Sequence, residues 1–319
     1  MDNSRAEEDQ GRDGLRLREV VAVLEGFYPP ATAQSWDRVG LVAGDPEQTI
    51  ESILLAVDPT LDVIAEAIEQ GADLIITHHP LLLRGIHSVA TTSAKGAAVT
   101  DLIVNDIALY CAHTNADVAD PGVGQALAAA CGLQLTEALE IAEEQELGRV
   151  GDLSEETTLA RLAQRLSDAL PPSGGGVRVS GPAGATVRRI AVLGGAGDSS
   201  FAAVRRSGAD VYVTADLRHH PAIEAREEAR ASARAGGRDT PYLIDAGHFA
   251  SEWLWLPGLR DRLAAELPQH VGIEISTVCT DPWDFVVDAR AATDVDHDQH
   301  GDTHDEQPTT QDDAAGGTP

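Results

Sequence analysis

The sequence predicts an α/β protein whose core is built twice from βαβ units. Short continuous apolar runs alternate with segments of helical periodicity, as in parallel sheets that helices cover on both faces. The run Gly71-Ala-Asp-Leu-Ile-Ile-Thr77 returns as Gly208-Ala-Asp-Val-Tyr-Val-Thr214, and the strand that begins near Ile53 returns near Ile190 at the same separation. Because the two units keep one register, we expect a duplication.

The first repeat is expected over residues 15–131. An amphipathic helix at 15–27 ends before Pro29-Pro30, and a loop, strand and turn follow at 35–46. The remaining elements alternate between apolar strands and helices in the βαβ order. They are strands at 53–58, 73–77 and 107–112, and helices at 61–69, 94–105 and 119–131.

A connecting segment at 132–186 and a second repeat at 187–288 are expected next. The connection contains a strand at 149–153, a helix at 156–170 and a Pro/Gly-rich break at 171–176. The second repeat is expected to hold strands at 189–194, 210–214, 242–245 and 271–280, and helices at 200–207 and from residue 248. We expect a disordered N-terminus at 1–14 and a disordered, acidic, His-containing tail at 289–319.

Composition restricts the class of protein and its partners. Hydrophobic residues make up 43% of 319, and no apolar run reaches the roughly 20 residues of a membrane span, so we expect a globular protein outside the membrane. The net charge of −29 disfavours nucleic-acid and anionic-membrane partners, because phosphate contacts require clustered Lys and Arg. The charged N-terminus lacks the apolar segment of a secretory signal, so we expect a cytoplasmic location. Three widely spaced cysteines indicate neither a disulfide framework nor a thiolate zinc site.

Polar side chains of ligand type follow two strands of the first repeat. His78 and His79 come directly after strand 73–77, and the next strand leads into His113-Thr-Asn-Ala-Asp117. Open α/β sheets bind ligands at the carboxyl ends of their strands. Neighbouring side chains on an extended chain point to opposite sides, so the two histidines can serve two metal ions, or one ion and one substrate. A surface pair without function is the alternative.

The second repeat offers a different pair of candidate ligands. A helix that begins near His248 places His248 and Glu252 on one face, one turn apart. Asp216 stands where the first repeat has His79, so the strand itself does not require a histidine there, and we expect Asp216 to have no part in metal binding.

Three further features have open interpretations. Trp36 and Asp37 stand side by side near a turn and either line a pocket or, in the case of the indole, cap the core. The glycines of 194–197 follow a strand but form no recognised phosphate-binding motif. Histidines of the tail either bind metal weakly or are simply solvated; these are His297, His300 and His304.

A set of motifs in order resembles one known family. The motifs are Trp36-Asp-Arg-Val-Gly-Leu41, Thr77-His-His-Pro80, Ala112-His-Thr-Asn-Ala-Asp117, Gly148-Arg-Val-Gly151, Thr214-Ala-Asp-Leu217 and Gly247-His-Phe-Ala-Ser-Glu252. They are similar to those of the GTP cyclohydrolase 1 type 2 homologs, also called NIF-three-like or YbgI-like proteins. The resemblance extends over about residues 15–288.

The resemblance implies more than the spacing does. It implies two intertwined βαβ-containing repeats with a di-metal site in the cleft between them, and a homohexamer. It implies two divalent metal ions per subunit, for which Zn, Fe, Mn and Ni all suit His and carboxylate ligands. The inserted domain of some members does not fit into 132–186. The implied metal ligands, of which Glu252 is the bridging one, are His78, His79, Asp117, His248 and Glu252.

Two functions are compatible with these residues. One is a di-metal hydrolase that acts on GTP or another nucleotide or heterocyclic small molecule through a metal-activated water. The alternative is a non-catalytic metal-binding regulator or a metallochaperone-like scaffold. A Ser or Cys hydrolase is disfavoured, because no G-x-S-x-G turn occurs and Cys111 lies within a strand.

Overall fold

The computed structural model describes residues 14–287, and those up to Phe285 form one compact unit. Apart from Gly14, the disordered termini expected at 1–14 and 289–319 lie outside this range, as do the three histidines of the tail. Among the described residues, no helix combines the length and the apolar character needed to cross a membrane.

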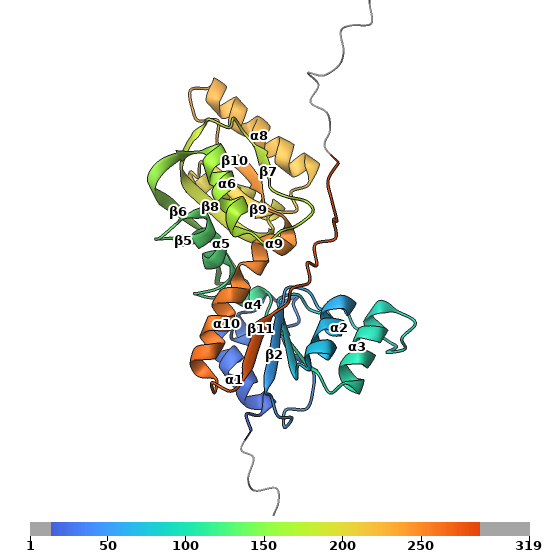
Figure 1. The fold of residues 1–319 in the computed structure, drawn as a ribbon. Coiled ribbons are helices and arrows are strands. Elements are labelled where there is room, and N and C mark those ends of the chain that lie inside the picture. Colours follow the sequence, from blue (N-terminus) through green and yellow to red (C-terminus); the bar gives the residue numbers. More distant parts are fainter. Residues whose placement is uncertain (1–13, 288–319) are drawn as a thin grey trace, which may run out of the picture. The chain divides into compact units, whose positions relative to one another are not determined.

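Five strands form the first sheet, in the order β1-β4-β3-β2-β11. Its neighbouring strands β2 and β11 are labelled in Figure 1. Strands β4, β3, β2 and β11 run parallel, and β1 is antiparallel at one edge. Their bounds are β1 Gly40–Ala43, β2 Ser52–Ala56, β3 Leu74–Thr77, β4 Ala108–Cys111 and β11 Gly272–Ile275.

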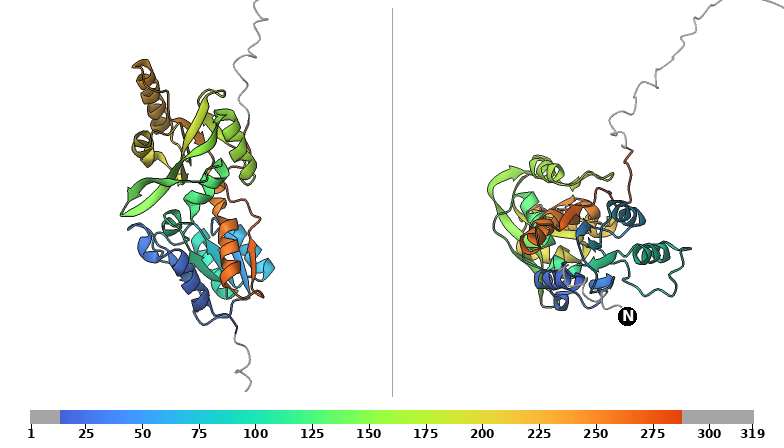
Figure 2. Two further views of the ribbon diagram at one scale, coloured as in Figure 1. Left: turned by 90° about the vertical axis from the view of Figure 1, so that its left-hand side faces the viewer. Right: turned by 60° about the horizontal axis from the view of Figure 1, so that its bottom comes forward.

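Helices cover both faces of this sheet, which explains the continuous apolar runs of its strands. Leu55 and Ile76 point to the face that carries α1 (Leu17–Phe27) and α10 (Trp255–Glu266), whose ribbons also lie together in Figure 2. Leu54 and Ile75 point to the opposite face, where they pack with the helices α2 (Leu61–Gln70) and α3 (Ala94–Val104). Alternate side chains of one strand therefore enter two different cores.

Six strands form the second sheet, in the order β5-β6-β8-β9-β10-β7. The segment 132–186, which the sequence analysis treats as a connection, supplies three of these strands and one of the covering helices. The strands are β5 Glu137–Ala142, β6 Gln145–Thr158, β7 Arg178–Ser180, β8 Thr186–Ala196, β9 Val211–Ala215 and β10 Tyr242–Asp245. Helices α5 (Val123–Cys131) and α6 (Leu159–Ala169) pack on one face, and α7 (Phe201–Ser207) and α8 (His219–Arg234) on the other.

The two repeats exchange their last elements. Helix α5 follows the strands of the first repeat but packs against Ile190 and Val192 of the second sheet. Helix α10 follows the strands of the second repeat but packs against the first sheet, and β11 then pairs with β2. The fold class of two intertwined βαβ-containing repeats is thereby confirmed.

The candidate ligands lie just past the ends of three strands. β3 ends one residue before His78, β4 leads into the single turn α4 (Thr114–Asp117), and β10 leads into α9 (His248–Trp253). The break between α9 and α10 has a local cause, because Pro257 has no N–H and its ring excludes the carbonyl of the residue four positions earlier, Trp253. Two 3₁₀ turns complete the described elements, η1 (Pro30–Thr32) and η2 (Asp198–Ser200).

Candidate metal centre

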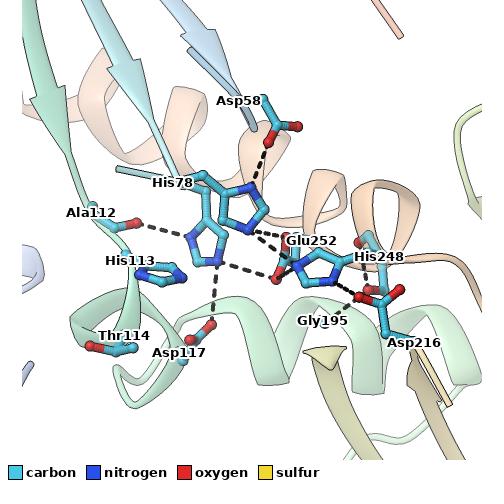
Figure 3. A network of polar contacts seen from close by, with 12 residues as sticks. Asp58, His78, Ala112, His113, Thr114, Asp117, Gly195, Asp216, His248 and Glu252 are labelled. Atoms are coloured by element: carbon cyan, nitrogen blue, oxygen red, sulfur yellow. Dashed lines mark hydrogen bonds and ion pairs between the residues drawn. The ribbon is translucent and has the colours of Figure 1, made fainter. Parts of the chain in front are cut away.

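Three histidines and two carboxylates from both repeats converge on one partly buried centre (Figure 3). Nε2 of His78 lies 3.6 Å from Oδ1 of Asp117 and 3.5 Å from Oε1 of Glu252. Nε2 of His79 lies 3.0 Å from Oε2 of Glu252, and Nε2 of His248 lies 3.2 Å from Oε1 of the same carboxylate. Glu252 thus stands between all three rings. The five residues that the resemblance implies as metal ligands therefore lie together at this centre.

Local backbone structure fixes the approach of each ligand. The sheet ladder continues past the end of β3, since N–H of His78 donates to Ala56 O and N–H of His79 to Val57 O. On the other side of the centre, α9 begins at His248, so the i, i+4 spacing places Glu252 one turn later on the same face, as the sequence predicts.

Each of the three rings is held through its other nitrogen. In every case Nδ1 donates to an oxygen, which leaves Nε2 to face the centre. The acceptors are Ala112 O for His78 at 2.9 Å, Asp58 Oδ1 for His79 at 2.7 Å, and Asp216 Oδ2 for His248 at 2.8 Å. Such outer partners are the usual means by which proteins orient metal-ligating imidazoles.

Asp216 corrects the sequence analysis, which gave it no part in metal binding. Its carboxylate orients His248, so the position that corresponds to His79 supports a ligand instead of providing one. Asp58 was not singled out either. It is the second residue past the end of β2, and a carboxylate just past a strand that neighbours the His-His strand was the available signal.

His113 is a further histidine of the centre, which the sequence analysis noted only as part of a motif. A ligand atom of His113 lies within 4.8 Å of those of His78 and His79. Its Nδ1 donates to Oδ1 of Asp37 at 3.0 Å, and Asp37 also accepts from N–H and Oγ of Thr114 at 3.0 and 2.6 Å. Burial raises the pKa of Asp37, but these hydrogen bonds outweigh it and hold the pKa below its usual value. The anionic form of Asp37 behind His113 is therefore favoured.

The donor set fits a divalent cation. The Nε2 atoms of His79 and His248 lie 3.2 Å apart, and Nδ1 of each ring is already the donor of a hydrogen bond. Two neutral rings would therefore direct Nε2 lone pairs at each other, and two protonated rings would direct N–H groups at each other. A cation bound by both Nε2 atoms would remove this repulsion. Nε2 of His78 is buried without a hydrogen bond, and Oε2 of Glu252 lies beside His79 without the alignment of one. Tetrahedral ligands of zinc lie about 3.3 Å apart, close to the separations within this group.

Charge at the centre is strongly coupled. Burial lowers the pKa of His79, but Glu252 and Asp58 outweigh it and raise the pKa to about 10. Burial also lowers the pKa of His248, which Glu252 and Asp216 raise to about 9. Burial raises the pKa of Asp117 to about 6. Burial opposes ionisation of Glu252 as well, yet His78 and His79 hold its pKa well below the usual value. The anionic groups therefore demand positive charge, which either protons or metal ions supply.

Gly195 brings bare backbone against the centre. It has φ of +66°, and a Cβ at this position would lie 2.3 Å from Oε1 of Glu252 and 3.3 Å from Nε2 of His248. Its N–H donates to Oγ of Ser251 at 3.0 Å. Any side chain here would displace the carboxylate, so the glycines at 194–197 serve a close approach, and the sequence analysis found no role for them.

The fold and the centre define a class of α/β proteins in which two intertwined repeats jointly hold a cluster of histidines and carboxylates. The chain belongs to the Duf34/NIF3 (NGG1p interacting factor 3) family, whose model matches residues 15–282. This confirms the family that the motifs indicate.

Similar proteins agree with this membership. A GTP cyclohydrolase 1 type 2 homolog of Streptomyces coelicolor is 45% identical over 84% of this chain and 93% of its own length. One of Mycobacterium tuberculosis is 32% identical over 85% of this chain and 97% of its own. That alignment spans 380 residues, more than this chain contains, so the mycobacterial protein has residues without a counterpart here.

Solved structures match over most of the chain as well. A Bacillus cereus protein related to NIF3 has a TM-score of 0.74 at 26% identity, and the match covers 86% of this chain and all of the other. Reduced HcgD from Methanocaldococcus jannaschii has a TM-score of 0.68 at 29% identity, with 83% of this chain and 98% of the other covered.

Proposed function

We propose that this protein is a metal-dependent hydrolase that acts on a nucleotide or a related heterocyclic small molecule at a site for two divalent ions. The observation that carries the proposal is the arrangement of the rings: Nε2 of each ring faces the centre because Nδ1 is fixed by an acceptor. A cluster that served only to stabilise the fold would pair its buried polar atoms, yet Nε2 of His78 has no partner.

The contacts suggest how the residues would share two ions. His78 and Asp117 would hold one ion, His79 and His248 the other, and Glu252, which contacts all three rings, would bind both. When bound, such ions supply Lewis acidity and lower the pKa of coordinated water towards about 7. The aspartates behind the rings keep Nε2 directed at the centre, and Gly195 leaves room for the bridging carboxylate. The names of the curated relatives support a nucleotide such as GTP as the substrate to test first.

Turnover by the metal-loaded protein tests this proposal. The full chain, reconstituted with Zn, Mn, Fe or Ni, is incubated with GTP and a panel of nucleotides and nucleosides, and products are separated by chromatography. We expect consumption of at least one compound, lost in Glu252→Gln and kept in Asp168→Asn, whose carboxylate is exposed on α6. Full metal occupancy without turnover would instead favour a metal-binding regulator or a metallochaperone-like scaffold.

We further propose a homohexamer, which the resemblance to the family implies. Light scattering coupled to size exclusion should give six times the mass of the chain, 33.6 kDa each. A monomer or dimer at micromolar concentration would contradict this assembly.

A further inference from the structure

Trp36 combines high exposure with a fixed position next to the candidate metal centre. Its side chain is 50% exposed, whereas Trp255 is 2% exposed in the core. Among residues 14–287, none of the four hydrophobic clusters includes Trp36. A large aromatic side chain that contributes to no core and remains half exposed is typical of a binding surface.

The indole adjoins the histidines of the centre. Its ring centroid lies 5.7 Å from that of His113, at an interplanar angle of 80°. The ring of His113 in turn lies 5.1 Å from His78 and 5.4 Å from His79. A small molecule that reaches the candidate metal centre beside His113 would therefore also lie next to Trp36.

The loop that carries Trp36 is held by hydrogen bonds to the first repeat and to a turn of the second sheet. Nε1 of Trp36 donates to Oε1 of Gln34 at 2.7 Å, and N–H of Gln34 donates to Oγ of Thr114 at 3.0 Å. N–H and Oγ of Ser35 donate to Glu143, in the turn between β5 and β6, at 2.7 and 3.0 Å. A side chain fixed in this way before binding loses little entropy when a ligand packs on it.

We propose that Trp36 is the stacking surface for the planar ring of a substrate bound at the metal centre, and so selects aromatic heterocycles over compounds without a ring. This inference rests on the proposed function, which identifies the site. It adds a contact for the ring of the substrate, the part that the metal ions would not recognise. An indole face stacks on any flat base, so the contact explains selection of a ring class. Asp37, the next residue, simultaneously orients His113, so one loop sets both the stacking surface and a histidine of the centre.

Binding of two probes to the zinc-loaded full chain tests the proposal. Guanosine 5′-monophosphate carries a planar ring, and ribose 5-phosphate lacks it. Isothermal titration compares wild type with Trp36→Leu, and Trp283→Leu is the matched control, because it removes a 69% exposed indole from the segment after β11. We expect guanosine 5′-monophosphate to bind Trp36→Leu at least about tenfold more weakly, with ribose 5-phosphate and zinc content unchanged and with Trp283→Leu equal to wild type.

A second measurement keeps the proposal testable if Trp36→Leu folds poorly. Trp36→Phe retains the edge contact with His113, and in it guanosine 5′-monophosphate should quench tryptophan fluorescence less than it does in wild type, because only Trp255, whose ring centroid lies 5.6 Å from that of His78, remains beside the centre. Equal quenching of both proteins would overturn the proposal. So would unchanged affinity in Trp36→Leu, an equal loss for both probes, or no binding of guanosine 5′-monophosphate by wild type. Because binding alone is measured, an absence of turnover would refute the hydrolase and leave this result readable.

Discussion

Removal of the carboxylates behind two of the histidines should weaken metal binding in a defined order. Loss of such an outer partner typically costs 10- to 100-fold in metal affinity. The side chain of Asp216 is 56% exposed, so solvent screens its charge, and we expect Asp216→Asn to lower zinc affinity about tenfold, or ~1.4 kcal/mol. Asp58 is 28% exposed and also accepts from Oγ of Thr280, so Asp58→Asn should cost up to about 100-fold, or ~2.8 kcal/mol.

The backbone does not complicate this comparison. Asp216 has φ of +53°, a left-handed conformation that Asn also tolerates, so the substitution changes the charge without straining the chain. Zinc affinity is measured by competition with a chromophoric chelator, with Asp168→Asn on the exposed face of α6 as the control. If both variants behave as the control does, or if Asp216→Asn loses more affinity than Asp58→Asn, the orienting role assigned to these carboxylates is wrong.

Three other perturbations should give distinct results. Glu252→Gln keeps the volume and removes the charge between the rings, so metal content should fall to one ion or none; full occupancy would show that Glu252 does not bridge. Gly195→Ala should reduce metal content, because its Cβ would collide with Glu252. The control is Gly208→Ala, which introduces the same left-handed strain at φ of +70° but has open space around its Cβ and should keep its metal. Equal metal content in the two variants would contradict the steric argument. The pKa values of His79 and His248 are raised to about 10 and 9, and their Nε2 atoms, 3.2 Å apart, can share a proton in the metal-free chain, so zinc binding at pH 7.5 should release at least one proton, measured by calorimetry in buffers of different ionisation enthalpy. Affinity should accordingly fall as pH falls below 9, and binding without proton release would refute these assignments.

Strong periodicity made most of the fold predictable, and the exceptions have physical causes. The strands at 53–58, 73–77 and 107–112 appear as β2, β3 and β4, because burial on both faces requires continuous apolar runs. Helix α8 was not foreseen, since its sequence is rich in Arg and Glu and its buried residues are two alanines and an arginine, Ala225, Arg226 and Ala229, which form no apolar periodicity. The strand expected at 271–280 ends at Ile275, where the chain turns so that Thr277 can bond to Glu66.

Topology and side-chain partners were less accessible to sequence than the elements themselves. Nothing in the local pattern of α5 or α10 reveals that each covers the other repeat's sheet, because an amphipathic face fits any apolar surface. The histidines of the candidate metal centre were recognisable from their places at strand ends. The acceptors behind them were not, since Asp58 and Asp37 are 21 and 76 residues away from the rings that they orient.

Metal content of the protein purified without added metal, and again after reconstitution, tests the central claim most directly. Three histidines and two carboxylates from both repeats surround one centre, and Nε2 of His78 there has no hydrogen-bond partner. Elemental analysis should therefore give about two divalent ions per chain after reconstitution. A chain that is folded, retains all five side chains and still binds no divalent ion after reconstitution would contradict the account.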